Sequence, residues 1–175
     1  MTPTTSVEKV TKLSKLDLQE LCDAADEGVR GGGGFGWLTP PERRVMEAYW
    51  TGVLLVPERS LIVGRLDGVI CGSAQLVRPS RNNEAQAHCA QMMTNFVAPW
   101  ARGHGLARGI AVAVEEEACA LGVSVLNLDV RETQGAAIQL YQSLGYQLYG
   151  THPRYARVDG AWVAGHFFWK DLSRA

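Results

Sequence analysis

The residues with the clearest capacity for chemistry form a glycine-bearing loop, Arg102 to Ala107, between a predicted strand and a predicted helix. Backbone N–H groups at a helix start have no partner inside the helix, and the helix dipole adds positive potential there. Gly103 and Gly105 have no side chains, so a bulky anion can approach the backbone closely. The loop therefore predicts a phosphate or pyrophosphate site, although an ordinary tight turn would show the same local pattern.

The sequence lacks the residues that two other kinds of phosphate-binding site require. The sequence has no G-x-x-x-x-G-K-S/T loop, so we do not expect a nucleoside triphosphate held with magnesium. The third glycine and the acidic residue of a dinucleotide-binding fingerprint are also missing, and Ala111 to Val114 stand there instead. A nicotinamide dinucleotide is therefore not expected.

Length and composition are those of an ordinary globular chain of 175 residues, with 46% hydrophobic and 20% charged residues. The formal net charge of -1 gives no reason to expect a nucleic acid partner. No apolar stretch predicts a signal peptide or a membrane span, so we expect a cytoplasmic protein without a membrane partner. The sequence has four cysteines, Cys22, Cys71, Cys89 and Cys119. Their spacing is not that of zinc ligands, so we expect no metal site.

The reactive residues need a framework, and hydrophobic spacing predicts one of helices and strands. The expected strands cover 7–13, 60–65, 69–77, 87–97, 124–130, 146–158 and 161–169. The expected helices cover 14–29, 104–121 and 134–144, and one more begins at Thr39-Pro40-Pro41-Glu42. The order of these elements predicts an α+β fold around a mixed sheet.

Local signals set several of these boundaries. Ser14 is expected to cap the first helix, with Asp17 in its first turn. Thr39 is expected to cap the second helix, with Glu42 completing a capping box. Gly122 is expected to end the helix over 104–121. Two-residue hairpin turns are expected at Asp67-Gly68 and Asp159-Gly160.

Two separated segments resemble the signatures of the GNAT superfamily of acetyl-CoA-dependent N-acetyltransferases. The first, Arg102-Gly103-His104-Gly105-Leu106-Ala107, has the pattern Q/R-x-x-G-x-G/A and follows a V-x-P at Val97 and Pro99. The second is Ala137-Ile138-x-Leu140-Tyr141-x-x-Leu144-Gly145-Tyr146, and residues 166–172 resemble the last strand of that fold. The resemblance is dense over 87–172. It implies one domain over 1–175, with a mixed, mostly antiparallel sheet of about seven strands and about four helices.

The resemblance implies acetyl-CoA as co-substrate and no metal. The backbone N–H groups of the glycine loop would hold the pyrophosphate, and the Val97 N–H would stabilise the developing oxyanion between the strands over 87–97 and 124–130. Gln134 replaces the asparagine usual in the family, and its amide can still reach the pantetheine arm. The other residues implied in cofactor binding are Phe96, Arg102, Gly103, His104, Gly105, Leu106 and Ala107.

The resemblance also suggests two catalytic groups. The Tyr141 phenol would protonate the leaving thiolate; the alternative is a buried helix aromatic. Asp129 is our first choice for the base, directly or through water, because it lies on the strand face opposite the apolar residues; a solvated strand residue is the alternative. His88 and Glu84 are competing bases, whereas His152 and His166 are expected to be structural.

A narrower likeness concerns the acceptor. Residues 32–37, Leu128-Asp129 and Tyr155 before Asp159-Gly160 resemble the tabtoxin-resistance group, which acts on an amino-acid-like toxin, although Gln91 stands where that group has a second acid. We therefore expect a small, amino-acid-like primary amine as acceptor. A protein lysine or N-terminus, or a non-catalytic acyl-CoA sensor, remain alternatives, and family precedent suggests a homodimer. Trp37, Tyr49 and Trp50 either line the acceptor pocket or belong to the core.

Overall fold

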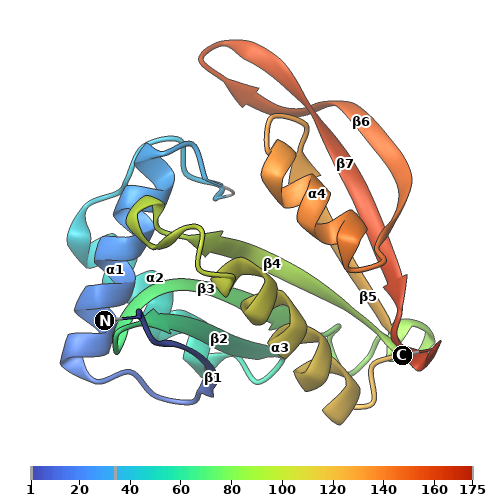
Figure 1. The fold of residues 1–175 in the computed structure, drawn as a ribbon. Coiled ribbons are helices and arrows are strands. Elements are labelled where there is room, and N and C mark those ends of the chain that lie inside the picture. Colours follow the sequence, from blue (N-terminus) through green and yellow to red (C-terminus); the bar gives the residue numbers. More distant parts are fainter. Residues whose placement is uncertain (1, 34, 175) are drawn as a thin grey trace.

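A computed structural model describes residues 2–33 and 35–174, and Figure 1 shows its fold. The strands are β1 (Thr5–Val10), β2 (Arg59–Leu66), β3 (Val69–Val77), β4 (Cys89–Val97), β5 (Val125–Arg131), β6 (Gln147–Val158) and β7 (Ala161–Asp171). The α-helices are α1 (Lys15–Arg30), α2 (Arg43–Leu55), α3 (Leu106–Ala120) and α4 (Gly135–Ser143). This is the predicted order of elements. None of the helices in the described part of the chain is long and apolar enough to cross a membrane.

The strands form one seven-stranded sheet in the order β1-β2-β3-β4-β5-β7-β6. Neighbouring strands run antiparallel except β4 and β5, which run parallel. The predicted α+β fold with a mixed, mostly antiparallel sheet is therefore confirmed. The one parallel junction joins a half made of β1–β4 to a half made of β5–β7, and Figure 1 shows the two halves diverging from it.

Local sequence explains most element boundaries. The Ser14 hydroxyl accepts a hydrogen bond from the Asp17 N–H at 3.0 Å, and the Asp17 carboxylate accepts one from the Ser14 N–H, which completes a capping box at α1. Gly122 follows α3 with φ +78, and the Val123 N–H donates to the Ala118 carbonyl across it. Both predicted hairpin turns have positive φ at their Asp and Gly residues, as a type I′ turn requires.

The prediction for the start of α2 was wrong. The helix begins at Arg43, its N-cap is Glu42, and no side chain caps it. The two prolines stand outside the helix, so the helical run starts only after them. The remaining differences are smaller: α3 begins at Leu106 rather than at 104, β1 ends at Val10, and a short 3-10 turn over Glu84–Gln86 precedes β4. Gly34, which the sequence assigns to the loop after α1, lies outside the described residues.

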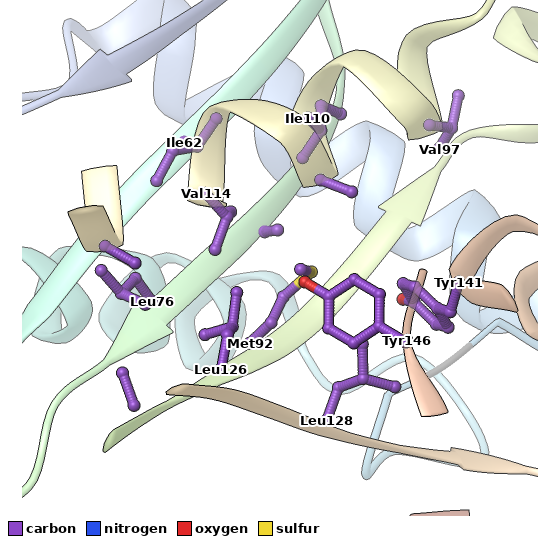
Figure 2. Close-up of a cluster of buried hydrophobic side chains, with 14 of the residues drawn as sticks. Ile62, Leu76, Met92, Val97, Ile110, Val114, Leu126, Leu128, Tyr141 and Tyr146 are labelled. Carbon is purple, nitrogen blue, oxygen red and sulfur yellow. The ribbon is translucent and has the colours of Figure 1, made fainter. Parts of the chain in front are cut away.

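The β1–β4 half is covered on both faces. α1 and α2 cover one face, where Leu21, Trp50 and Phe96 belong to one buried cluster. α3 covers the other face, where its residues pack with β2–β5 and with α4 in a second cluster. Figure 2 shows this second cluster, in which Tyr141 and Tyr146 lie beside Leu128. β6 forms the far edge of the sheet and is mostly exposed.

Candidate functional site

The parallel junction of the sheet opens along its length. β4 and β5 are paired at three successive positions, of which Gln91 opposite Asn127 is the last. Beyond it β4 remains paired with β3, and β5 remains paired with β7, so the two strands separate. Two cavities of about 490 Å³ and about 550 Å³ flank the opening. Tyr141, Asn95, Gln134 and Ala137 line both of them, so the cavities meet at these residues.

The larger cavity contains the predicted anion-binding loop. Gly105 is the N-cap of α3 with φ +77, a conformation that costs a glycine little. The first helical hydrogen bond runs from the Gly109 N–H to the Gly105 carbonyl at 3.0 Å. The N–H groups of Leu106, Ala107 and Arg108 therefore have no partner within the helix, and these three residues line the cavity. We call it the cofactor cavity.

A second helix start faces the same cavity. α4 begins at Gly135, and its first three residues, Gly135, Ala136 and Ala137, line the cofactor cavity. Their N–H groups have no partner within the helix. Gln134 precedes them and donates from Nε2 to the Gly32 carbonyl at 2.6 Å. The side chain that the family resemblance assigns to the pantetheine arm thus also ties the α4 start to the loop after α1.

The charge of the cofactor cavity suits an anion. Among the described residues that line it, the charged ones are Arg102 and Arg108. Arg102 donates from Nε to the Val97 carbonyl at 3.3 Å, and Arg108 donates from Nη2 to the Ser143 hydroxyl at 2.6 Å. Neither arginine has a carboxylate partner among the described ion pairs, so both positive charges remain available to a phosphate.

Val97 has its backbone N–H aimed into the opening. The neighbouring Ala98 N–H donates to the Cys71 carbonyl of β3 at 2.7 Å. Hydrogen-bonded and non-bonded pairs alternate along antiparallel strands, so the next pair, Gly72 and Val97, does not exchange hydrogen bonds. The Val97 N–H therefore points away from β3 and toward the gap that β5 has left.

Tyr141 stands where the two cavities meet. Its side chain is 6% exposed, and its ring packs edge-on against Tyr146 at 5.7 Å between centroids. Burial raises the pKa of Tyr141 to about 12, a contact with Asn95 lowers it, and the charge of Asp129 raises it. The phenol therefore stays protonated at neutral pH and can act as a proton donor.

The smaller cavity contains Asp129, and we call it the acceptor cavity. Along β5 the residues alternate as predicted: Leu126, Leu128 and Val130 are buried, and Asp129 points to the opposite face. One Asp129 oxygen accepts from Gln91 Nε2 at 2.7 Å, and the other accepts from the Tyr155 hydroxyl. These two donors, from β4 and β6, fix the direction of the carboxylate.

The Tyr155 ring packs directly against Gly165. A Cβ atom at Gly165 of β7 would lie 2.1 Å from Cγ of the Tyr155 ring, so the ring occupies the space that any side chain at this position would need. Phe167, two residues further along β7, packs edge-on against the same ring at 5.8 Å between centroids. Burial and the bond to Asp129 both raise the pKa of Tyr155, so its hydroxyl keeps the proton that it donates.

The structure separates other predicted candidates from the site. Glu84 and His88 are exposed and line neither cavity, and His104 is also exposed and absent from the residues that line the cofactor cavity. Trp50 is fully buried in the cluster beneath α1 and α2, which makes it a core residue, and Tyr49 is partly buried and packs against that cluster. Trp37 packs against the same cluster. The described residues contain no group of three acidic, histidine or cysteine side chains that could hold a metal.

Sequence reasoning missed several residues that line the cavities. Asn95 lines both, and Arg131 and Arg157 line the acceptor cavity. Phe35 and Leu38 reach the acceptor cavity from the loop between α1 and α2, and the Phe35 carbonyl accepts a hydrogen bond from Arg131. These contacts join segments far apart in the chain, so no local spacing indicated them. Among the residues predicted to bind the cofactor, those that line the cofactor cavity are Phe96, Val97, Arg102, Gly103, Gly105, Leu106, Ala107 and Gln134, and their binding role stays a prediction.

Comparisons with known proteins identify the family of the chain. A family model described as the acetyltransferase (GNAT) family matches residues 18–146. An uncharacterized N-acetyltransferase in the hisH-hisA intergenic region of Azospirillum brasilense is 69% identical over 129 residues, which cover 74% of this chain and 77% of that protein.

Solved structures share the fold. An N-acetyltransferase from Staphylococcus aureus Mu50 superposes with a TM-score of 0.82 at 19% identity and covers 97% of this chain and 99% of its own. A GNAT superfamily phosphinothricin acetyltransferase from Sinorhizobium meliloti, in complex with acetyl-CoA, superposes with a TM-score of 0.79 at 20% identity over 97% of this chain and 89% of its own. The match of the family model and the identity to the Azospirillum protein show that the chain belongs to the acetyltransferase (GNAT) family and is an acetyl-CoA-dependent N-acetyltransferase.

Proposed function

We propose that the protein transfers the acetyl group of acetyl-CoA to the primary amine of a small, amino-acid-like molecule. The observation that carries this proposal is the meeting of two cavities at Tyr141 in the opening between β4 and β5. One cavity is lined by helix starts and arginines, which suits a pyrophosphate, and the other contains a carboxylate, which suits an amine. A ligand in each would bring its reactive end to the same point.

The cofactor cavity would hold acetyl-CoA through this chain's backbone. The free N–H groups at the start of α3 would bind the pyrophosphate, with Arg102 adding charge. Acetyl-CoA would supply an activated acyl group as a thioester. The Val97 N–H, free of β3, would donate to the thioester oxygen as negative charge develops on it.

Two side chains would move the protons. A primary amine is mostly an ammonium ion at neutral pH and must lose one proton to free the lone pair that attacks. Asp129, in the acceptor cavity, would accept this proton, directly or through water. The new C–N bond forms as the C–S bond breaks, and Tyr141 would give its phenolic proton to the leaving thiolate. The nitrogen loses its second proton to water as the amide forms, and the Tyr141 oxygen regains a proton from water. The products are the N-acetylated amine and free CoA.

The acceptor cavity favours a small molecule over a protein chain. Its volume of about 490 Å³ lies in the range of small-ligand sites. Residues from the α1–α2 loop, β4, β5 and β6 line it, including Phe35, Leu38 and Tyr155, so protein surrounds it on several sides.

A thiol-release assay would test the proposal. Acetyl-CoA would be offered with glycine, L-lysine, putrescine, kanamycin or an alanine-terminated hexapeptide, and CoA binding would be measured by calorimetry. We expect turnover with the free amino acids above that with the hexapeptide. Turnover with the hexapeptide alone would indicate a protein acetyltransferase, and CoA binding without any thiol release would indicate a sensor.

A further inference from the structure

The acetyl-transfer site contains one buried polar atom without a partner. The Asn95 side-chain oxygen is inaccessible to solvent and accepts no hydrogen bond from the described residues. Its Nδ2 lies 3.8 Å from the sulfur of Met92, a weak contact, and the Asn95 side chain also contacts Tyr141, which lowers the pKa of that phenol. Buried polar atoms in native structures nearly always have a partner, so an unpaired one beside a ligand cavity points to a ligand that supplies it.

A backbone irregularity in β4 aims Asn95 at this point. The register between β3 and β4 shifts, so Gln75 pairs with Met93 and Ser73 pairs with Phe96, which leaves two β4 residues opposite Ala74. Thr94, the first of these two, has φ +48. This is a β-bulge, and an extra residue reverses the side-chain alternation that follows it.

The side chains around the bulge show that reversal. The Thr94 hydroxyl accepts a hydrogen bond from Gln75 Nε2 at 2.8 Å on the face that α1 and α2 cover, where Gln75 also reaches Tyr49. Phe96 returns to that same face, in the α1–α2 cluster. Asn95, between them, therefore points to the opposite face, on which Tyr141 and α4 lie. Regular alternation would have directed it toward α1 and α2.

Several polar groups at the junction of the cavities act as hydrogen-bond donors. The Val97 N–H is a donor, the Tyr141 hydroxyl holds its proton, and Gln134 Nε2 donates to Gly32. An attacking amine keeps N–H bonds of its own, which need acceptors if its lone pair is to face the thioester carbon. Among the side-chain oxygens at this junction, Asn95 Oδ1 is the one that is buried without a hydrogen-bond partner among the described residues, so it is an acceptor that can orient one of these bonds.

We propose that Asn95 is a substrate-binding residue whose side-chain oxygen accepts a hydrogen bond from the attacking amine. Of the two N–H bonds of a neutral primary amine, one points to Asn95 and persists in the amide product. Asp129 takes the proton that first converts the ammonium into this neutral amine. The lone pair then forms the C–N bond, the C–S bond breaks as the thiolate takes the Tyr141 proton, and the second N–H proton leaves to water, from which the Tyr141 oxygen regains its proton. This proposal rests on the proposed function, because it needs an amine at that place.

The test compares Asn95→Leu with wild type, using the amine of the five-compound panel that has the highest kcat/KM. Leucine keeps the branched shape and removes the acceptor. We expect kcat/KM for the amine to fall by about tenfold to a hundredfold, the range for one lost hydrogen bond to a substrate. We expect the calorimetric affinity for CoA to stay unchanged. The Tm should change little, because the variant removes a buried oxygen without a partner along with the amide contacts to Met92 and Tyr141.

Asn127→Leu is the matched control. Asn127 is also a half-buried strand asparagine, but it lines neither cavity and donates to the Ala90 carbonyl at 3.5 Å. Its replacement should leave the amine kcat/KM unchanged. Asn95→Ala provides a second folded variant with the same expected loss.

The outcomes separate this proposal from the proposed function. Equal amine kcat/KM in wild type and both Asn95 variants would overturn the role of Asn95 and leave acetyl transfer intact. A loss of activity matched by a lower Tm or a weaker CoA affinity would show a structural role instead. A panel without any turnover by wild type would contradict the proposed function and the role of Asn95 together.

Discussion

The two cavities that meet at Tyr141 are built in different ways. The cofactor cavity is formed largely by backbone: glycines 28, 31, 33, 103, 105 and 135 line it, together with the first turns of α3 and α4. The acceptor cavity is formed by side chains from the α1–α2 loop, β4, β5 and β6, and it includes Asp129, Arg131, Tyr155 and Arg157.

This difference determines how each cavity tolerates sequence change. A backbone cradle keeps its N–H groups whatever side chains surround it, provided that glycine remains where φ is positive. A cavity lined by side chains changes its chemistry with each substitution. Members of one family can therefore share a cofactor while accepting different amines, and the predictions below test the two constructions separately.

The largest effect is expected where the cavities meet. Tyr141→Phe keeps the buried ring and removes the proton, so turnover should fall by roughly 10²–10⁴ if the phenol protonates the thiolate. Calorimetric CoA affinity should change little. Tyr146→Phe is the control, because Tyr146 packs against Tyr141 but lines neither cavity. Wild-type turnover in Tyr141→Phe, measured where chemistry limits the rate, would remove Tyr141 from the mechanism.

The pH dependence of stability offers a second measurement on the same variant. Burial raises the pKa of Tyr141 to about 12 in the folded protein, whereas a phenol in the unfolded chain titrates near 10. The buried neutral phenol therefore favours folding below pH of about 10, and this advantage disappears as pH rises toward about 12. Across that range the free energy of unfolding should fall more steeply in wild type than in Tyr141→Phe, as measured by denaturant titration.

The next effect belongs to the acceptor cavity. Asp129→Asn keeps the shape of the side chain and removes its basicity, so activity at neutral pH should fall by about 10² if Asp129 accepts the proton of the amine. Part of the activity should return at high pH, where more of the amine is already deprotonated. A pH–rate profile for kcat/KM checks this. Equal loss at every pH would indicate that Asp129 positions the amine, and no loss would leave water as the base, because Glu84 and His88 lie outside both cavities.

The third effect tests the backbone cradle. Gly105→Val places a branched side chain at φ +77, beside the N–H groups expected to bind the pyrophosphate. The acetyl-CoA KM should rise by roughly tenfold to a hundredfold, the cost of losing a charge-assisted hydrogen bond. Gly122→Val is a matched control at the other end of α3, since Gly122 has φ +78 and open space around it. An equal KM in the two variants would rule out Gly105 as part of the site.

The sequence predicted the backbone-built parts well because their determinants are local. The capping box of Ser14 and Asp17, the Asp-Gly hairpin turns and the glycine loop before α3 each depend on a few neighbouring residues. The alternation of β5 was also sufficient to place Asp129 opposite the buried face. The failure at Thr39 was local as well: the pattern fits a capping box, yet the helix begins only after Pro41.

The side-chain contacts within the site could not be predicted from local sequence patterns. Asn95 faces Tyr141 because of a bulge at Thr94, and Thr94 is not a glycine, so nothing in the strand sequence signalled a positive φ. Tyr155 reaches Asp129 across the sheet from 26 residues away. Such contacts depend on strand order and register, which a hydrophobic pattern does not specify.

The smallest effect is expected from a residue that touches no ligand cavity. Gly165→Ala adds a Cβ that would lie 2.1 Å from the Tyr155 ring, so the ring must move and its hydroxyl must leave Asp129. We expect the free energy of unfolding to fall by about 1–3 kcal/mol from this overpacking. The amine kcat/KM should fall by a few-fold, because Gln91 still holds the other carboxylate oxygen.

Tyr155→Phe should reproduce the loss of activity without the loss of stability, since it removes the hydroxyl and keeps the ring packed against Gly165. Gly150→Ala, on β6 with open space around it, should change neither quantity. If Gly165→Ala lowered stability while Tyr155→Phe left kcat/KM at the wild-type value, the Tyr155–Asp129 bond would be a packing contact without influence on acetyl transfer, and the Gln91 hydrogen bond would be sufficient to orient the Asp129 carboxylate.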